Sequence, residues 1–196
     1  MAFIVLEGYS GTGKTTLSRG LERRGWLRFQ ESAHALPDHV PVADRGDTFS
    51  DYSLFGATLS YSSAISRLRG TRNLVSEGYL LSDLAYAKVR FGLKKSGAYP
   101  ALLALCREAL KSPRLRPDLY IALKAGHGTV KRIQAMKSER DREMAGIFRE
   151  SYYEALAEVH RVLGESMVET LIMDTDPKVT LRAVLAIIEN RNVISP

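Results

Sequence analysis

The sequence has little cysteine and no long hydrophobic run. Cys106 is the only cysteine among 196 residues, which excludes an internal disulfide and favours a reducing compartment, for which the cytoplasm fits best. No charged leader precedes the apolar residues at 3–6, and that run is far too short to span a bilayer. We therefore expect a soluble cytoplasmic protein with no membrane partner.

Other absences limit the expected number of domains and the kinds of ligand. The chain shows no internal repeat, low-complexity segment or linker, so residues 1–196 are expected to form one domain. The four histidines show no paired metal-ligand spacing, and no metal is assigned to them. The formal net charge is +6 and the pI is near 9.5. This charge favours phosphate-bearing partners without selecting one.

Short apolar runs alternate with amphipathic segments along the chain. The pattern predicts strands at 2–7, 26–31, 72–77, 117–123 and 170–173, and helices at 14–24, 54–69, 80–91, 99–110, 130–163 (with a break near 140) and 179–190. Strands separated by helices indicate an α/β fold. We expect a three-layer sandwich in which helices cover both faces of a parallel sheet of about five strands.

A phosphate-binding loop follows the first expected strand. Residues 8–15 read Gly-Tyr-Ser-Gly-Thr-Gly-Lys-Thr, which matches the spacing G-x-x-x-x-G-K-[ST] between a strand and a helix. In such a P-loop the glycines let backbone N–H groups surround phosphate oxygens, Lys14 reaches the outer phosphates, and Thr15 can ligate magnesium. The expected nucleotide contacts are Gly8, Ser10, Gly11, Thr12, Gly13, Lys14, Thr15 and Thr16.

The loop predicts ATP and Mg²⁺ as cofactors but leaves the reaction open, because motors, GTPases and kinases share this device. The chain lacks the Asn-Lys-x-Asp motif that reads guanine, which argues against a GTPase.

Several further motifs lie along the chain, before and after the P-loop. They comprise the approach to the P-loop at 3–8, the acidic segment 73–79 with Ser82, Ala85 and Tyr86, the segment 117–123, the arginine-rich segment 132–143, and the segments 148–153 and 173–177. Over nearly its whole length the chain thereby resembles the thymidylate kinase branch of the P-loop nucleotide and deoxynucleoside kinases.

The resemblance implies roles for several residues. It implies an arginine-rich lid at about 128–143, in which Arg132 and Arg140 settle over the transferred phosphoryl group. Arg142 and Asp174 would lie on the nucleotide side. Phe55, Tyr79 and Tyr86 would contact the acceptor, with Phe55 in the place of the family's base-stacking phenylalanine.

The chain also departs from the thymidylate kinases at the acceptor side. Ser10 stands where they usually carry an aspartate, Gly78 where an arginine follows the acidic residue, Leu59 near an expected base-contacting arginine, and Ala87 in place of a glutamine. The resemblance therefore implies a kinase with a divergent acceptor.

Glu77 is the acidic residue most directly tied to chemistry, since it ends an expected buried strand beside the phosphate site. It can organise magnesium, which suits a phosphate acceptor, or accept a proton from an attacking hydroxyl, which suits an alcohol. Glu77 mildly favours a hydroxyl acceptor. The glycine at Gly78, where the family carries an arginine, points the same way.

The main hypothesis is transfer of the γ-phosphoryl group of ATP to a nucleotide or nucleoside-like acceptor, with Lys14, Glu77, Arg132 and Arg140 as catalytic residues and Thr15 and Glu77 on the metal. One alternative is a kinase acting on a hydroxyl of a modified nucleoside or of a modified base in DNA. Another is a nucleic-acid-binding ATPase without a small acceptor. A homodimer is left open.

Overall fold

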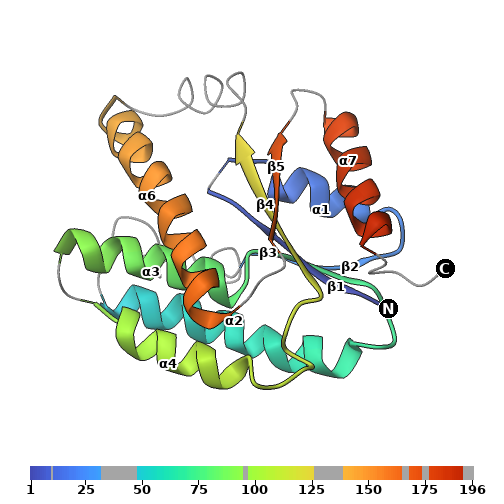
Figure 1. Cartoon of the computed structure of the whole chain (residues 1–196), viewed down its shortest axis with the longest axis horizontal. Coiled ribbons are helices and arrows are strands. Elements are labelled where there is room, and N and C mark those ends of the chain that lie inside the picture. The colour runs from blue at the N-terminus through green and yellow to red at the C-terminus, as the bar shows by residue number, and fades with distance from the viewer. Residues whose placement is uncertain are drawn as a thin grey trace.

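The computed structural model describes residues 1–9, 11–31, 48–94, 97–125, 139–164, 168–173 and 177–191. Within them, five parallel strands form one sheet in the order β2-β3-β1-β4-β5 (Figure 1). The strands are β1 (Phe3–Glu7), β2 (Leu27–Phe29), β3 (Leu74–Glu77), β4 (Leu119–Ala125) and β5 (Val168–Met173). This confirms the expected α/β fold and its parallel sheet.

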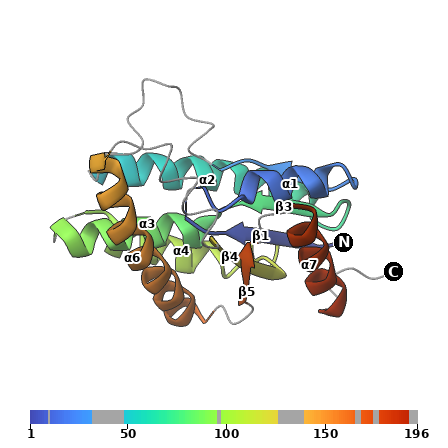
Figure 2. The same cartoon turned by 90° about the horizontal axis from the view of Figure 1, so that it is seen from above.

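Helices cover both faces of this sheet, which makes three layers (Figures 1 and 2). The described helices are α1 (Lys14–Glu22), α2 (Thr48–Leu68), α3 (Leu80–Lys94), α4 (Tyr99–Ala109), α6 (Glu139–Leu163) and α7 (Pro177–Asn190). Helices α1 and α7 pack on one face, and α2, α3, α4 and α6 lie together on the other.

The alternation of side chains along β1 feeds two hydrophobic cores. Phe3 and Val5 join the core under α2, α3, α4 and α6, whereas Ile4 and Leu6 join the core under α1 and α7. Successive residues of a strand point to opposite faces, so a strand buried on both sides must be apolar throughout. All five residues of β1 are buried, and at about 25 cal/mol per Å² of apolar surface such central strands contribute much of the stability.

Most element boundaries differ from the expectations by one to three residues, and α2 and β4 show why. Helix α2 begins at Thr48, six residues before the expected start. Phe49 and Tyr52 are three residues apart, but the serines and the aspartate of residues 48–53 are equally typical of a loop. Asp51 in this first turn suits the positive end of the helix dipole. Strand β4 begins after Pro117, which has no N–H to donate to the sheet, and runs on to Ala125.

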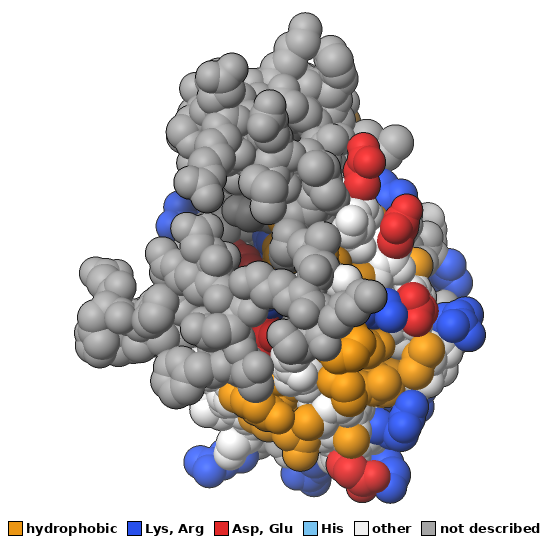
Figure 3. Space-filling view, turned by 90° about the vertical axis from the view of Figure 1, so that its left-hand side faces the viewer, with side chains coloured by type: hydrophobic (Ala, Val, Ile, Leu, Met, Phe, Trp, Pro, Cys, Tyr) orange, Lys and Arg blue, Asp and Glu red, His pale blue; other side chains and the backbone are white. Residues whose placement is uncertain are grey.

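The side of the molecule that carries α2, α3, α4 and α6 shows hydrophobic side chains gathered low on its face, with charged side chains around them (Figure 3). In the part of the chain that the structure describes, none of the helices combines the length and the apolar character that crossing a bilayer requires.

Candidate functional site

The phosphate loop leaves the carboxyl end of β1, the central strand, which pairs with β3 on one side and β4 on the other. The chain builds one half of the sheet and then the other from this strand, and open α/β sheets bind ligands at such a switch point. Gly8 has φ +150°, and a Cβ there would lie 2.6 Å from Thr12 Oγ1 and 2.7 Å from the carbonyl oxygen of Leu123. The loop therefore needs a glycine at this position.

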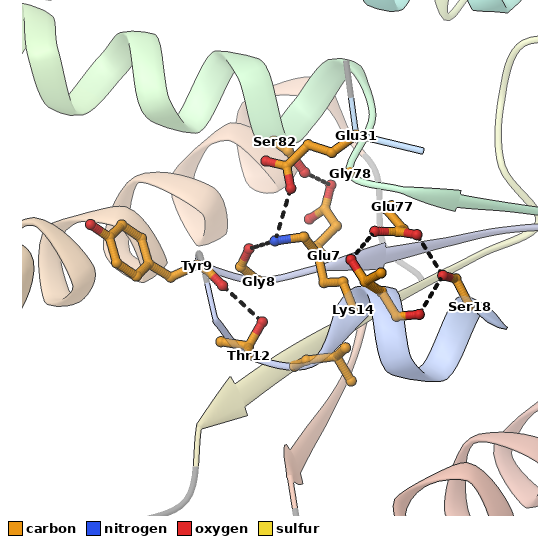
Figure 4. Close-up of polar contacts among 12 residues, drawn as sticks. Glu7, Gly8, Tyr9, Thr12, Lys14, Ser18, Glu31, Glu77, Gly78 and Ser82 are labelled. Atoms are coloured by element: carbon orange, nitrogen blue, oxygen red, sulfur yellow. Dashed lines mark hydrogen bonds and ion pairs between the residues drawn. The ribbon is translucent and has the colours of Figure 1, made fainter. Parts of the chain in front are cut away.

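Lys14 occupies the first position of α1 and is 6% exposed. Its Nζ donates a hydrogen bond of 2.6 Å to the Gly8 carbonyl oxygen and lies 3.4 Å from Glu31 Oε2 (Figure 4). The ammonium group thus lies inside the curve of the loop, where it can reach phosphate oxygens.

Glu31 was missed by sequence reasoning because no motif surrounds it. It comes two residues after β2 and its side chain is 28% exposed. The one signal in the sequence was its place as the last residue of an expected strand, since the carboxyl ends of parallel strands meet at one edge of a sheet. The structure brings its carboxylate to the P-loop lysine.

The Glu77 carboxylate is held by two hydroxyl groups of α1. Thr15 Oγ1 donates to Oε2 at 2.5 Å, and Ser18 Oγ donates to Oε1 at 2.5 Å. Glu77 itself is 1% exposed. The structure therefore places the expected metal pair, Thr15 and Glu77, side by side, and adds Ser18, which sequence reasoning did not select.

Arg28 approaches the same carboxylate from β2. Its Nε lies 3.5 Å from Glu77 Oε1, and its side chain is 6% exposed. Its Nη1 has no hydrogen-bond partner among the described residues. A cation beside Glu77 offsets the cost of burying that carboxylate.

Glu7, the last residue of β1, braces the loop from behind. Its Oε2 lies 3.0 Å from His160 Nε2 of α6, and its Oε1 accepts a 3.3 Å hydrogen bond from Ser82 of α3. The Tyr153 hydroxyl donates to the Leu123 carbonyl oxygen at 2.6 Å and accepts from Tyr9 N at 3.4 Å. The base of the P-loop is thereby tied to both α3 and α6.

Of the three aromatic residues expected at the acceptor, only Tyr86 is partly exposed. Its ring lies 4.6 Å from that of Tyr152 and 6.1 Å from that of Tyr9 in the P-loop, measured between centroids. Phe55 and Tyr79 are 1% and 2% exposed. Both belong to the hydrophobic core, so the structure brings Tyr86 alone of these three to the phosphate loop.

Tyr79 is held in the core by contacts of both its ring and its hydroxyl group. Its ring packs edge-on against Phe3 at 5.3 Å, and its hydroxyl lies 3.0 Å from Ser62 Oγ. Burial raises the pKa of Tyr79 to about 12, against the smaller opposing effect of the Ser62 hydrogen bond. The phenol is therefore a neutral core residue at ordinary pH.

A further carboxylate lies on the first turn of α3. Burial raises the pKa of Asp83 to about 7, although a 2.5 Å hydrogen bond from Thr58 Oγ1 opposes the rise. The nearby carboxylates of Glu31 and Asp51 raise this pKa further, and the Arg90 guanidinium lowers it. Asp83 is thus electrostatically coupled to Glu31 of the site.

Asp51 and Arg90 join the start of α2 to α3. Arg90 Nε donates to Asp51 Oδ1 at 2.7 Å, and Nη2 donates to the same oxygen. The guanidinium carbon also lies 5.9 Å from the centre of the Tyr86 ring. This ion pair holds the position of Tyr86 through a cation–π contact.

Several expected site residues lie outside the described residues: Ser10, Arg132 and Asp174. Arg140 and Arg142 lie in the first turn of α6, with side chains outside the described part of the structure. Most of the expected lid at 128–143 therefore stays a prediction. Among the described P-loop residues, Thr12 is buried, Gly11 and Thr16 are exposed, and Gly13 directly precedes α1 with φ +88°.

No protein-family model matches the sequence, and no curated protein matches it either. Solved structures do match. A thymidylate kinase from Candida albicans aligns with a TM-score of 0.70 at 14% identity and covers 100% of this chain and 95% of its own.

Two other kinds of protein give similar alignments. Deoxyadenosine kinase from M. mycoides with bound dCTP aligns with a TM-score of 0.59 at 19% identity over 96% of this chain and 99% of its own. The NadR protein in complex with NR aligns with a TM-score of 0.66 at 15% identity, over 99% of this chain but 51% of its own. At such identities the likeness shows a shared fold.

Proposed function

We propose that this chain is an ATP-dependent kinase that transfers the γ-phosphoryl group to a hydroxyl of a nucleoside-like acceptor. The observation that carries the proposal is the meeting of three strand ends. Lys14 after β1, Glu31 after β2 and Glu77 at the end of β3 converge on the phosphate loop. The fold shared with thymidylate and deoxyadenosine kinases supports it.

The donor side follows from the P-loop. The backbone N–H groups of residues 8–15 would surround the ATP phosphates, with Lys14 neutralising the outer ones. Thr15 Oγ1 and the Glu77 carboxylate are hard oxygen ligands, which fit Mg²⁺ held by one or two protein groups and by phosphates. Bound there, the ion would screen the charge on the transferred phosphoryl group.

We assign different roles to the two glutamates. Both oxygens of Glu77 already accept hydroxyl hydrogen bonds, and its side chain is almost fully buried, so it suits a fixed metal-side role. Glu31 is more exposed, and the one ion pair that it makes among the described residues is with Lys14. We therefore assign Glu31 as the base that accepts the proton of the attacking hydroxyl.

Gly78 supports a hydroxyl acceptor rather than a phosphate. It lies directly after Glu77 with φ +70°, a backbone conformation that residues other than glycine rarely adopt. An arginine at this position, which would attract an acceptor phosphate, would be strained. Tyr86 supplies an aromatic face for a base, and Asp83 supplies a hydrogen-bonding carboxyl group on the same helix.

The test is product formation. The purified chain would be incubated with ATP and Mg²⁺, and with a panel of deoxynucleosides, their monophosphates, and DNA with or without hydroxymethylated bases. Mass spectrometry would then detect phosphorylated acceptors. We expect a nucleoside-type hydroxyl to be phosphorylated, and Lys14→Ala to abolish the product while leaving the fold intact.

Three other outcomes would contradict the proposal. Phosphorylation of monophosphates alone would move the chain to the nucleotide kinases. ATP hydrolysis that no acceptor changes would indicate a P-loop ATPase. Turnover near the wild-type rate in Lys14→Ala would remove the P-loop mechanism.

A further inference from the structure

The end of the molecule opposite the phosphate loop carries an exposed basic surface. It consists of Arg67, Arg72, Arg107, Lys111, Arg114 and Arg116, and all six side chains are exposed. They come from the end of α2, the turn that follows it, the end of α4 and the connection to β4. We propose that this basic surface binds the phosphodiester backbone of a nucleic acid.

The first argument is the distribution of charge. Residues 67–72 and 107–118 hold seven basic and two acidic residues, a net charge of +5 within a chain whose total is +6. The two carboxylates are already engaged, because Glu108 binds Lys111 at 2.7 Å and Asp118 binds Arg69 at 2.5 Å. These two segments therefore carry a net charge of +5, whereas the rest of the chain carries +1.

The helix dipole explains only part of this cluster. Arg67 and Arg107 lie in the last turns of α2 and α4, where a cation is favourable without any partner. Arg72, Arg114 and Arg116 lie in connections outside the helices. Nothing in the secondary structure requires arginine at these three positions.

The second argument is that the backbone under these side chains is fixed. Arg69 lies between Arg67 and Arg72 in the chain, and its Nη1 donates to the carbonyl oxygens of Pro113 (2.7 Å) and Arg116. This brings the connection after α4 against the turn after α2. The start of β1 is bonded to both, since Ala2 N donates to Asn73 Oδ1 at 2.9 Å and Phe3 N donates to Asp118 Oδ2 at 2.8 Å.

A held backbone lowers the ordering cost of binding, because only the side chains must then be immobilised. Arginine also suits the proposed ligand better than lysine does. Its planar guanidinium can donate two hydrogen bonds to one phosphate, and five of the six side chains of the basic surface are arginine.

The third argument is that these cations cannot serve the nucleotide. The basic surface adjoins Leu74 and Leu119, the first residues of β3 and β4, whereas the P-loop and Glu77 lie where β1 and β3 end. Because all the described strands are parallel, these are opposite edges of the sheet. A polyanion on the basic surface would leave the phosphate loop open.

A nucleic acid fits better than an anionic membrane. Proteins that lie on membranes insert apolar side chains beside their cations. Of the large exposed hydrophobic residues in the described part of the chain, Tyr52 and Val179 lie away from the basic surface. Met1, next to the Ala2–Asn73 contact, and Leu105, two residues before Arg107, lie near it, but two separate side chains are less than the apolar face that such insertion needs.

The experiment compares two double variants of equal charge. Arg72→Ala/Arg114→Ala removes two cations of the basic surface. Arg19→Ala/Arg182→Ala removes two exposed arginines from α1 and α7, on the other face of the sheet. Binding of a fluorescein-labelled DNA duplex and of a single strand would be measured by anisotropy between about 50 and 200 mM salt, over which phosphate contacts weaken strongly.

We expect the wild type to bind with a steep salt dependence. Arg72→Ala/Arg114→Ala should weaken binding about tenfold or more and reduce the slope of log K against log salt by about 2, since each lost phosphate contact contributes about 0.9. The control pair should change binding about twofold at most. Melting temperature and ATP turnover should be unchanged in both, and ATP should not compete with DNA.

Other results would overturn the inference. Equal losses in the two double variants would mean that binding follows net charge alone. Undetectable DNA binding at the lowest salt would rule out a nucleic acid as the ligand of the basic surface. Binding to vesicles containing phosphatidylserine, without binding to nucleic acid, would assign the surface to membranes instead. These readouts do not depend on kinase activity, so they can fail while the proposed function stands.

Discussion

Thr15 Oγ1 lies 2.5 Å from Glu77 Oε2, although 62 positions of the chain separate the two residues. The contact exists because β3 pairs with β1 in parallel, with Glu77 opposite Leu6. The first turn of α1 then brings the threonine hydroxyl over the end of β3. These two oxygens form the ligand set that we propose for Mg²⁺ on the donor side of the site.

Glu77→Gln should therefore act on the metal. The amide keeps the size of the side chain and one accepting oxygen, so it can keep the hydrogen bond from Thr15 or the one from Ser18. It loses the negative charge that favours a cation. We expect the Mg²⁺ requirement to rise about 10- to 100-fold, with part of the rate recovered by added metal. Titration of the rate with Mg²⁺ measures this.

Ser18→Ala is the matched control, because it removes one hydrogen bond to the same carboxylate and leaves its charge. It should shift the Mg²⁺ titration less. A Glu77→Gln enzyme with the wild-type rate at limiting Mg²⁺ would remove the residue from the metal site.

Glu31→Gln should act on proton transfer. If Glu31 accepts the proton of the acceptor hydroxyl, the change should lower kcat by about 100- to 10,000-fold and leave the Kd for ATP nearly unchanged. Turnover and ATP-binding measurements on the variant check both statements, and an unchanged kcat would return the base role to another carboxylate.

Asp83→Asn should change how stability depends on pH. The folded protein holds the pKa of Asp83 at about 7, against an ordinary value of 3.8, so between these values the folded state binds more protons than the unfolded state. This group therefore adds stability at low pH, and that stability is lost as pH rises toward 7. Relative to the wild type, Asp83→Asn should be more stable at pH 8 than at pH 5.

The free energy of unfolding of Asp83→Asn relative to the wild type should change with pH by at most about 4 kcal/mol, because each unit of pKa shift corresponds to about 1.4 kcal/mol. Urea unfolding of both proteins at several pH values measures it. Thr58→Val removes the hydroxyl that favours the ionised carboxyl group, so it should steepen the loss of stability with pH. A constant difference between Asp83→Asn and the wild type from pH 5 to 8 would contradict the raised pKa.

Gly8→Ala should disrupt the phosphate loop. The added Cβ would lie 2.6 Å from Thr12 Oγ1 and 2.7 Å from a backbone oxygen of β4, so the loop must shift. Gly25→Ala is a matched control, since Gly25 also has a positive φ, of +87°, but nothing within 4 Å of the new methyl group. Both pay the backbone cost of about 1 kcal/mol.

Through overpacking, Gly8→Ala should lose about 1–3 kcal/mol more stability than Gly25→Ala does. It should also lose ATP binding. Thermal melting and ATP titration of the two variants measure this. Equal behaviour of the two variants would show that the approach of β4 to Gly8 does not constrain the loop.

Local features of this protein were determined by the sequence alone. Strand β1, the loop at 8–15 and helix α1 were predicted because a buried apolar run, glycine spacing and a helical period act over a few residues each. The parallel sheet followed from the alternation of elements. The start of α2 was not predicted, because the serines and the aspartate of residues 48–53 are equally typical of a loop.

The tertiary structure decided which distant residues meet. Glu31, Ser18 and Arg28 carry no motif, and they join the site only because β2 and α1 both lie beside β3. Phe55 and Tyr79 have the residue type of base-stacking groups, yet packing buries them in the core. A side chain's type limits what it can contact, whereas strand order and helix packing determine what lies within hydrogen-bonding distance.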